Sequence, residues 1–419
     1  MNLNVIRKQF VRLSGFLALQ PATIGVLTMV ILVGMGERMA ERFLPIYILA
    51  MGGSALAVGL LQAMDNLLSA LYSFPGGYLS DRIGTKRSLL IFNLVAMAGF
   101  ALVVLVPSWQ AVLAGAVLFI SWSAISLPAT MSLMYKVLPH SKRTMGVTMH
   151  SLVRRIPMAL GPLLGGVFIA VWGEQDGVRL AFVAALAMAG VALIMQQRLI
   201  DDDGPEKKTT VNCELRPEKN PIKLFRRMPV DMKGLLISDI LIRFCEQIPY
   251  AFVVVWCMQV IEKPVSAIQF GVLTSIEMAT AVLVYIPVAY MADRSLKKPF
   301  VTATFVFFTL FPLVLMHSQT FVWLVGAFVL RGLKEFGEPT RKSLIMDLAP
   351  DDCRAAMFGL YYLIRDVFVS AAALGGAFLW LIDPRVNLWT AFAFGVIGTF
   401  GFILFGRDSR KETQSVCNE

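Results

Sequence analysis

Ionisable side chains interrupt the long apolar stretches of this chain, and they are the residues most informative about its chemistry. An ionisable residue at the centre of a membrane-spanning helix costs about 2.5–3.5 kcal/mol, so each one is by default a candidate functional residue. Eight basic and eight acidic residues have this setting: Glu37, Arg38, Glu41, Arg42, Asp65, Arg154, Arg155, Arg243, Glu246, Glu277, Arg331, Lys334, Glu335, Glu338, Arg365 and Asp366. Because the two signs balance, pairing that only joins helices is the competing interpretation.

Two of these residues recur as a pair. Arg38 and Glu41 are three positions apart, and Arg243 and Glu246 repeat that spacing 205 positions later. Residues three apart lie on one face of a helix. Each pair can therefore present opposite charges to the same surface.

A denser group of charges has no counterpart in the first half of the chain. It consists of Arg331, Lys334, Glu335 and Glu338. Lys334 and Glu338 have the i,i+4 spacing of a helical ion pair, and Gly337 with Pro339 predicts a kink. We expect this group to contact a polar or charged part of a solute; local pairing of Arg331 with Glu335 is the alternative.

The apolar stretches that carry these charges predict membrane helices. Hydrophobic residues make up 57% of the chain and charged residues only 16%, against roughly 25% charged in a typical soluble domain. Soluble, disordered and fibrous classes are therefore excluded, and a lipid bilayer is the expected solvent. With about 20 apolar residues needed for each crossing, the predicted spans are 22–48, 54–78, 87–106, 110–133, 146–171, 179–198, 234–258, 266–291, 299–317, 321–344, 355–381 and 387–406.

The basic residues predict the orientation of these spans. If both termini are cytoplasmic, the inner segments carry 27 Lys and Arg residues and the outer connections carry only Arg179, Lys263 and Arg385. This asymmetry is the positive-inside pattern of a multi-pass protein of the cell membrane. The net charge of +10 is therefore explained by membrane topology and by contact with anionic lipid, and it does not indicate binding to nucleic acid.

The two halves of the sequence are copies. At an offset of 212 or 211 the second half repeats polar, proline and glycine residues of the first: Gly59 and Gly271, Asp65 and Glu277, Pro75 and Pro287, Asp81 and Asp293, Lys86 and Lys298, Arg154 and Arg365, and Gly165 and Gly376. We therefore predict an all-α membrane protein of 12 transmembrane helices in two parallel pseudo-symmetric six-helix bundles, with a solute site between them. The predicted domains are an N-terminal bundle (1–198), a cytoplasmic linker (199–233), a C-terminal bundle (234–406) and a cytoplasmic tail (407–419).

One loop motif connects the sequence to a family. The run from Gly77 to Arg87, GYLSDRIGTKR, resembles the signature cytoplasmic loop of the major facilitator superfamily at every defined position. The resemblance implies that the motif latches the two halves in the outward-facing state. The residues carried over are Gly77, Asp81, Arg82, Gly84 and Lys86.

A second motif is partial. Gly161, Pro162, Gly165 and Gly166 resemble the core of the family's antiporter motif, with Pro157 where a glycine is expected. Glycines every four residues also serve close helix packing in any membrane protein. Residues 120–131 carry no charge, so the fourth span lacks the arginine found in many proton antiporters of the family.

The family architecture also suggests partners for the charges. It places the first and seventh spans along the central cavity, so Arg38, Glu41, Arg243 and Glu246 are expected to face the solute. Arg331, Glu335 and Glu338 are expected in the same cavity because of their charge. It places the second span against the eleventh and the fifth against the eighth. Asp65 is then expected to meet Arg365, and Arg154 to meet Glu277, in bridges whose breakage couples to protonation.

These observations predict a transporter, not an enzyme. We expect proton-coupled secondary active transport of a small polar, charged or amphipathic organic solute by alternating access, with efflux favoured by the glycine motif. Uptake of an organic ion with protons, or a sensor or scaffold that moves no solute, are the alternatives. Neither a cofactor nor a metal is expected, because no nucleophile–base set, metal-ligand spacing or phosphate-binding loop is present, and the protein is expected to be a monomer.

Overall fold

The computed structural model describes residues 21–83, 85–120, 153–199, 221–292, 296–350 and 354–407. Several predicted features fall outside these residues: Gly84, the end of the fourth predicted span, the linker over 200–220 and the tail beyond 407. The side chains of 73–85 are also outside the description, and with them the signature residues Gly77, Asp81 and Arg82. Their role as a latch stays a prediction.

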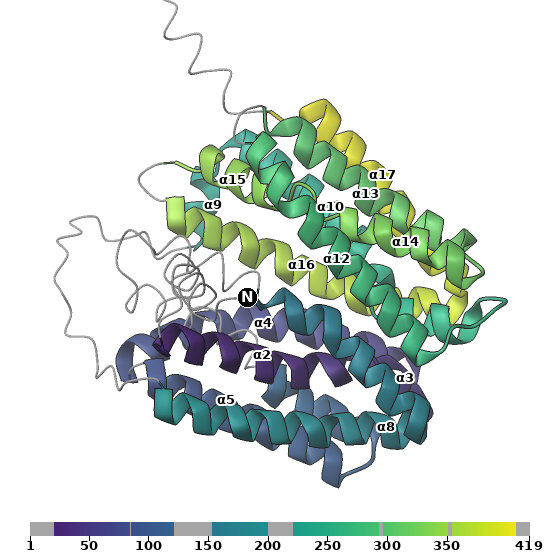
Figure 1. Cartoon of the computed structure of the whole chain (residues 1–419). Coiled ribbons are helices and arrows are strands. Elements are labelled where there is room, and N and C mark those ends of the chain that lie inside the picture. Colours follow the sequence, from purple (N-terminus) through teal and green to yellow (C-terminus); the bar gives the residue numbers. More distant parts are fainter. Residues whose placement is uncertain are drawn as a thin grey trace, which may run out of the picture. The chain divides into compact units, whose positions relative to one another are not determined.

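The regular structure of the described residues is helical (Figure 1). The first half contains α2 (Pro21–Glu41), α3 (Leu44–Ala50), α4 (Ala55–Ile83), α5 (Thr85–Leu105), the helix Trp109–Ile120 and α8 (Arg155–Leu199). The second half contains α9 (Pro221–Arg227), α10 (Val230–Tyr250), α11 (Val253–Val255), the π-helix η2 (Trp256–Val260), α12 (Ala267–Ala292), α13 (Lys298–His317), α14 (Phe321–Leu333), α15 (Glu338–Leu348), α16 (Arg354–Ile382) and α17 (Pro384–Phe405). Most of these helices begin and end within a few residues of the predicted spans.

Six of the described helices have the length and apolar composition to cross a membrane, and α10 with the bent segment Val253–Val260 makes a seventh. One of the six, α8, contains two predicted spans, which are separated at Gly173, where φ is +80°. This left-handed conformation suits glycine because it has no Cβ. Three shorter apolar helices, Ala55–Ser69, Trp109–Ile120 and Phe321–Leu333, fall in further predicted spans.

Three predicted spans are broken. The span 22–48 divides between α2 and α3, and Pro45 lies in the first turn of α3. The span 234–258 bends by 45° after Tyr250, one residue beyond Pro249, because a proline removes a backbone donor and disturbs the preceding turn. The span 321–344 breaks between Leu333 and Glu338, at the kink predicted from Gly337 and Pro339.

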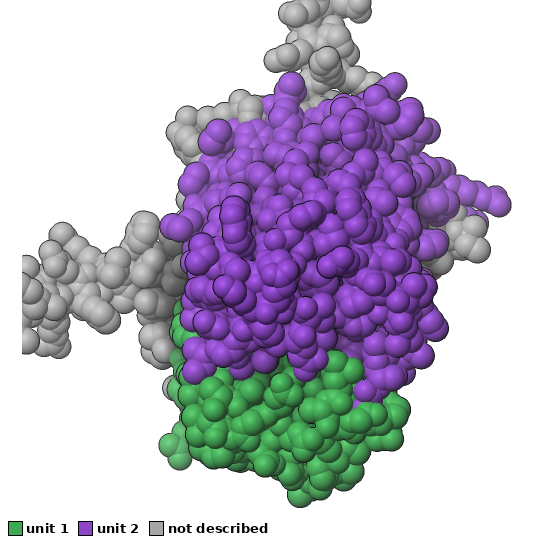
Figure 2. Space-filling model, turned by 90° about the vertical axis from the view of Figure 1, so that its right-hand side faces the viewer, with its two compact units in different colours: residues 1–52, 68–209 green, residues 53–67, 210–419 purple. Residues whose placement is uncertain are grey.

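The described helices form two compact units (Figure 2). Unit 1 comprises residues 1–52 and 68–209, and unit 2 comprises 53–67 and 210–419. The helix α4 is shared, since its first half groups with unit 2. The predicted domain limits at 198 and 234 stay a prediction.

A glycine packs the same pair of helices in each unit. In unit 1, α8 packs on α2, and a side chain added at Gly165 would overlap the carbonyl of Met39. In unit 2, α16 packs on α10, and a side chain at Gly376 would overlap the carbonyl of Ile248. Gly165 and Gly376 are 211 positions apart, so the sequence repeat is also a repeat of helix contacts. Close approach of this kind is the use of small residues in membrane helices.

The motif lysine is repeated in the same way. Lys86 donates to the carbonyl of Gln197 at 3.0 Å, and Lys298 donates to the carbonyl of Ile403 at 2.9 Å. Each acceptor lies in the last turn of the last helix of its bundle, where the free carbonyls and the helix dipole favour a cation. These two lysines therefore join corresponding helix ends.

Candidate functional site

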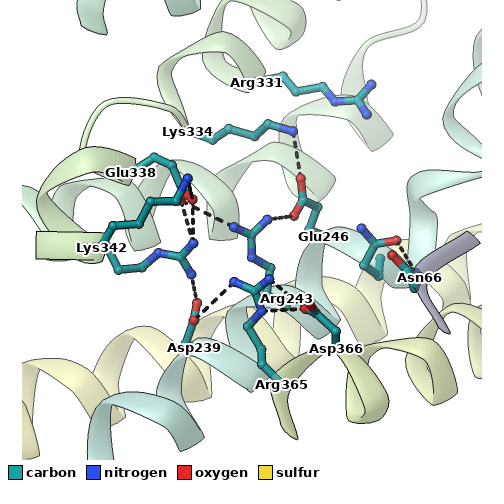
Figure 3. A network of polar contacts seen from close by, with 12 residues as sticks. Asn66, Asp239, Arg243, Glu246, Arg331, Lys334, Glu338, Lys342, Arg365 and Asp366 are labelled. Carbon is teal, nitrogen blue, oxygen red and sulfur yellow. Dashed lines mark hydrogen bonds and ion pairs between the residues drawn. The ribbon is translucent and has the colours of Figure 1, made fainter. Parts of the chain in front are cut away.

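The helix α10 places three charges of unit 2 on one face. Asp239, Arg243 and Glu246 are spaced by four and three residues, which aligns them along the helix. They meet charges from α14 with the turn that follows it, α15 and α16 (Figure 3). A further charge, Glu277, comes from α12. We call this set the charge cluster; its members are Asp239, Arg243, Glu246, Glu277, Arg331, Lys334, Glu338, Arg341, Arg365 and Asp366. Five are basic and five are acidic.

Glu246 is the carboxylate at the centre of the cluster. It accepts from Arg243 at 2.6 Å and from Lys334 at 2.8 Å. Each of these cations also has a second carboxylate: Lys334 lies 3.6 Å from Glu277, and Arg243 lies 3.4 Å from Glu338. Loss of charge on Glu246 therefore leaves both cations with a partner.

Arg331 is buried against aromatic rings. Its side chain is only 4% exposed and lies 3.3 Å from Glu277. The guanidinium is 5.2–5.6 Å from the ring centres of Tyr250, Phe311 and Phe328, within the range of cation–π attraction. The partner of Arg331 is thus on α12, whereas the sequence had offered local pairing with Glu335.

A second node of the cluster was missed by the sequence analysis. Asp239 is fully buried, pairs with Arg341, and also accepts from Tyr361 at 3.1 Å. Arg341 in turn donates to both oxygens of Glu338 at 2.7–2.8 Å, and Arg365 lies 3.8 Å from Asp239. The spacing of Asp239 to Arg243 was the available signal, but both Asp239 and Arg341 lie near the ends of predicted spans, where charge is ordinary.

The break between α14 and α15 positions two members of the cluster. The backbone N–H of Gly337 donates to Thr304 of α13 at 2.6 Å, and a side chain at Gly337 would meet Thr304 and the carbonyl of Phe300. This contact holds the turn against α13, with Lys334 before it and Glu338 after it. The predicted pair of Lys334 with Glu338 is replaced by the contacts of Lys334 with Glu246 and of Glu338 with Arg341.

A small cavity in unit 2 opens onto the cluster, with room for about one water molecule. Its lining combines one carboxylate, two cations and an apolar wall: Glu246, Arg331, Lys334, Val253, Phe308 and Phe311. The Nζ of Lys334 also lies 5.8 Å from the ring centre of Phe308. The cavity can therefore present both signs of charge and an aromatic surface to a small polar molecule.

The burial of its charges makes the contacts of the cluster costly to break. Removing one partner of a buried ion pair costs about 3–5 kcal/mol, because the other charge is left uncompensated in a low dielectric. Each charge of the cluster has at least one partner of opposite sign, and side chains such as Asp239, Glu277 and Arg341 are at most 2% exposed. Any ligand that enters must therefore replace the contacts it breaks.

Further predicted residues lie on α2 and α8 of unit 1. Arg38 and Glu41 pair at 2.7 Å on α2 in unit 1, so the repeated spacing does produce a repeated contact. Gly161 and Gly165 pack α8 against Arg38 and Met39 of α2, which is the packing use of that motif. Its other two members, Pro162 and Gly166, lie on α8 as well.

The two predicted bridges between spans involve Arg365 and Glu277 of the cluster, with Asp65 and Arg154 as their expected partners. Arg365 contacts Asp366 at 2.7 Å as well as Asp239, and Glu277 contacts Arg331 and Lys334. Asp65 lies on α4 and Arg154 immediately precedes α8. Pairing of Asp65 with Arg365 and of Arg154 with Glu277 stays a prediction.

Comparison with known proteins extends these findings. A family model described as Major Facilitator Superfamily matches residues 26–367 and again 264–416. An uncharacterized MFS-type transporter of Methanocaldococcus jannaschii is 22% identical over 365 residues, covering 84% of this chain and 87% of the relative. The uncharacterized MFS-type transporter YfkF of Bacillus subtilis is 26% identical over 153 residues, or 36% and 38% of the two chains.

Solved structures share the fold. The nucleoside transporter NupG is similar with a TM-score of 0.79 and 13% identity, over 92% of this chain and 100% of that one. A mutant of the peptide transporter POT has a TM-score of 0.74 and 16% identity, over 91% and 93% of the two chains. With the repeated bundles, the signature loop and this match along most of its length, the chain belongs to the Major Facilitator Superfamily and is a secondary transporter embedded in a membrane through multiple helices.

Proposed function

We propose that the protein exchanges a small polar, charged or amphipathic organic solute for protons by alternating access, and that the charge cluster of unit 2 binds both. The observation that carries this proposal is the environment of Glu246. Its two cations each have a second carboxylate at 3.4–3.6 Å. The carboxylate can therefore be neutralised by a proton, or turned toward a solute, without leaving Lys334 or Arg243 alone.

Coupling follows from competition for one carboxylate. A solute cation that pairs with Glu246 needs that group ionised, and a proton on Glu246 removes the charge that the solute needs. Proton and solute then bind alternately to the same state of the protein, which is the thermodynamic requirement for antiport. Glu277 and Asp65 are the next carboxylates to test, because Glu277 shares Lys334 with Glu246 and Asp65 is its counterpart in the repeat.

The solute class is consistent with what this fold accommodates. NupG is described as a nucleoside transporter and POT as a peptide transporter, and both names denote polar organic molecules. Identities of 13–16% establish the fold alone, so the choice of solute rests on the side chains of the cluster.

Direction and orientation belong to the same proposal. We place both termini in the cytoplasm from the distribution of Lys and Arg, and we propose export, with the signature loop, including Asp81 and Arg82, as the latch of the outward-facing state. Gly161 and Gly165 are accounted for by packing on α2, so the motif that suggested export has a structural use in this chain. Transport should therefore be measured from both sides of the membrane.

The experiment is solute-dependent proton movement in proteoliposomes. The purified protein is reconstituted with a pH-sensitive dye in the lumen, and amino acids, short peptides and nucleosides are added outside in turn. The wild type is expected to move protons in response to at least one solute, and Glu246→Gln is expected to abolish that response. Glu262→Gln is the matched control, because Glu262 lies exposed in the connection after η2.

Two results would contradict the proposal. One is a wild-type protein that moves labelled solute with no accompanying proton movement. The other is a proton response that survives in Glu246→Gln, Glu277→Gln and Asp65→Asn alike.

A further inference from the structure

The charge balance of the cluster restricts what it can bind. The ten members of the cluster sum to zero, with five basic and five acidic side chains that are each at most 28% exposed. Lys342, which also contacts Glu338, is 51% exposed and is compensated by solvent. A ligand with a net charge would add an excess charge to this buried set. A ligand that carries both signs would not.

Only one ion pair of the cluster lines the cavity with both partners. Glu246 and Lys334 are 2.8 Å apart, and their side chains are each 10% exposed. Arg331 also lines the cavity, but its guanidinium is held by Glu277 and three aromatic rings and is 4% exposed. The pair of Glu246 and Lys334 is therefore the one that a ligand can open.

We propose that the solute is a zwitterion with an apolar side chain, and that it binds by inserting its ammonium at Glu246 and its carboxylate at Lys334. This inference rests on the proposed function and names its substrate class. One protein–protein ion pair is replaced by two protein–solute pairs, so no buried charge is left without a partner. The cavity as it stands has room for about one water molecule, so the apolar side chain reaches the aromatic wall of Phe308 and Phe311 only as the pair of Glu246 and Lys334 opens.

The same charge balance predicts that singly charged analogues bind less tightly than the zwitterion. A cation at Glu246 displaces Lys334, which within the cluster keeps only Glu277 and shares it with Arg331. An anion at Lys334 leaves Glu246 with Arg243 as its one partner in the cluster. Each of these ligands adds one net charge to the buried cluster, and we expect that excess charge to cost about a 100-fold loss of affinity. An uncharged analogue forms neither protein–solute ion pair, so the pair of Glu246 and Lys334 stays closed.

The test uses two sets of four probes with one side chain each. The phenylalanine set consists of L-phenylalanine (zwitterion), its amide (cation), N-acetyl-L-phenylalanine (anion) and N-acetyl-L-phenylalaninamide (uncharged). The leucine set repeats these four forms without the ring. Equilibrium binding to the purified full chain is measured at several pH values, and the zwitterion of at least one set is expected to bind about 100-fold more tightly than the other three forms.

Charge variants of the same pair test the rule independently of any one affinity. Glu246→Gln gives the cluster a net charge of +1, so its preference is expected to move from the zwitterion to the N-acetyl anion. Lys334→Met gives a net charge of −1, and its preference is expected to move to the amide cation. Glu262→Gln and Lys263→Gln change the protein's charge equally at exposed positions, and both are expected to keep the wild-type order.

Acidification tests the same rule without a substitution. Zwitterion binding is expected to weaken as the pH falls, because protons compete for Glu246. The inference is overturned if no zwitterion of either set binds, if a singly charged form binds the wild type best at neutral pH, or if acidification strengthens zwitterion binding. It is also overturned if both cluster variants keep the wild-type order. Any of these results can accompany intact proton-coupled transport in the proteoliposome assay, so the two proposals fail separately.

Discussion

Replacing Arg341 with glutamine removes the cation that joins Asp239 to Glu338. The side chain of Arg341 is 2% exposed and that of Asp239 is fully buried, so the cost belongs to the class of broken buried ion pairs, about 3–5 kcal/mol. Asp239 keeps Tyr361 at 3.1 Å and Arg365 at 3.8 Å. These remaining contacts place the expected loss near the lower end, about 3 kcal/mol.

The assay is reversible unfolding in mixed micelles, with the free energy of unfolding compared between variants. The double variant Asp239→Asn, Arg341→Gln is expected to lose less than Arg341→Gln alone, because no buried charge of that pair is left uncompensated. Lys342→Gln is the matched control. Its side chain is 51% exposed and lies 3.4 Å from the same Glu338, so a loss below about 1 kcal/mol is expected.

A clear result would refute this reasoning. If Arg341→Gln cost no more than Lys342→Gln, the node around Asp239 would not be a tightly coupled buried pair. If the double variant lost the sum of the two single losses, the two side chains would act independently. Either outcome would remove the energetic basis for treating the cluster as one unit.

Two further predictions concern helix contacts in unit 2. Gly376→Ala is expected to destabilise the protein by about 1–3 kcal/mol, because its Cβ would overlap the backbone of Ile248. Gly375→Ala is the control, because a side chain there meets nothing within 4 Å. Equal losses of unfolding free energy for the two variants in the same assay would disprove the close packing. Lys298→Met is expected to lower the free energy of unfolding by about 0.3–1 kcal/mol, because the contact with the carbonyl of Ile403 is lost. Hydrogen exchange should then be faster in the last turn of α17. Unchanged exchange there would argue against the contact.

Much of the fold could be predicted from the sequence because apolar length is a local property. The spans 299–317 and 355–381 agree within a residue with α13 and α16. The break at Gly173 falls in the connection predicted between 171 and 179. The bend after Tyr250, beside Pro249, was not predicted, since proline occurs in many membrane helices without dividing them. The effect of such a proline depends on the neighbouring helices.

The site was predictable in part. The spacing of Arg243 and Glu246 correctly indicated a shared face, and the structure pairs them at 2.6 Å. The partners across helices were not accessible from one sequence: Glu277 contacts Lys334, and Asp239 contacts Arg341. Such contacts depend on the depth and rotation of each helix, which single-sequence patterns leave open.

Solute counterflow is the most direct test of a carrier whose binding site faces the two sides of the membrane in turn. Proteoliposomes are loaded with an excess of the solute that gives the largest proton signal, placed at equal pH on both sides, and diluted into a trace of the labelled form. Wild-type protein and Glu262→Gln should accumulate the label transiently above its equilibrium level, and Lys334→Met should not. Absence of any overshoot with the wild type, or an undiminished overshoot with Lys334→Met, would contradict the assignment of the solute site to the charge cluster.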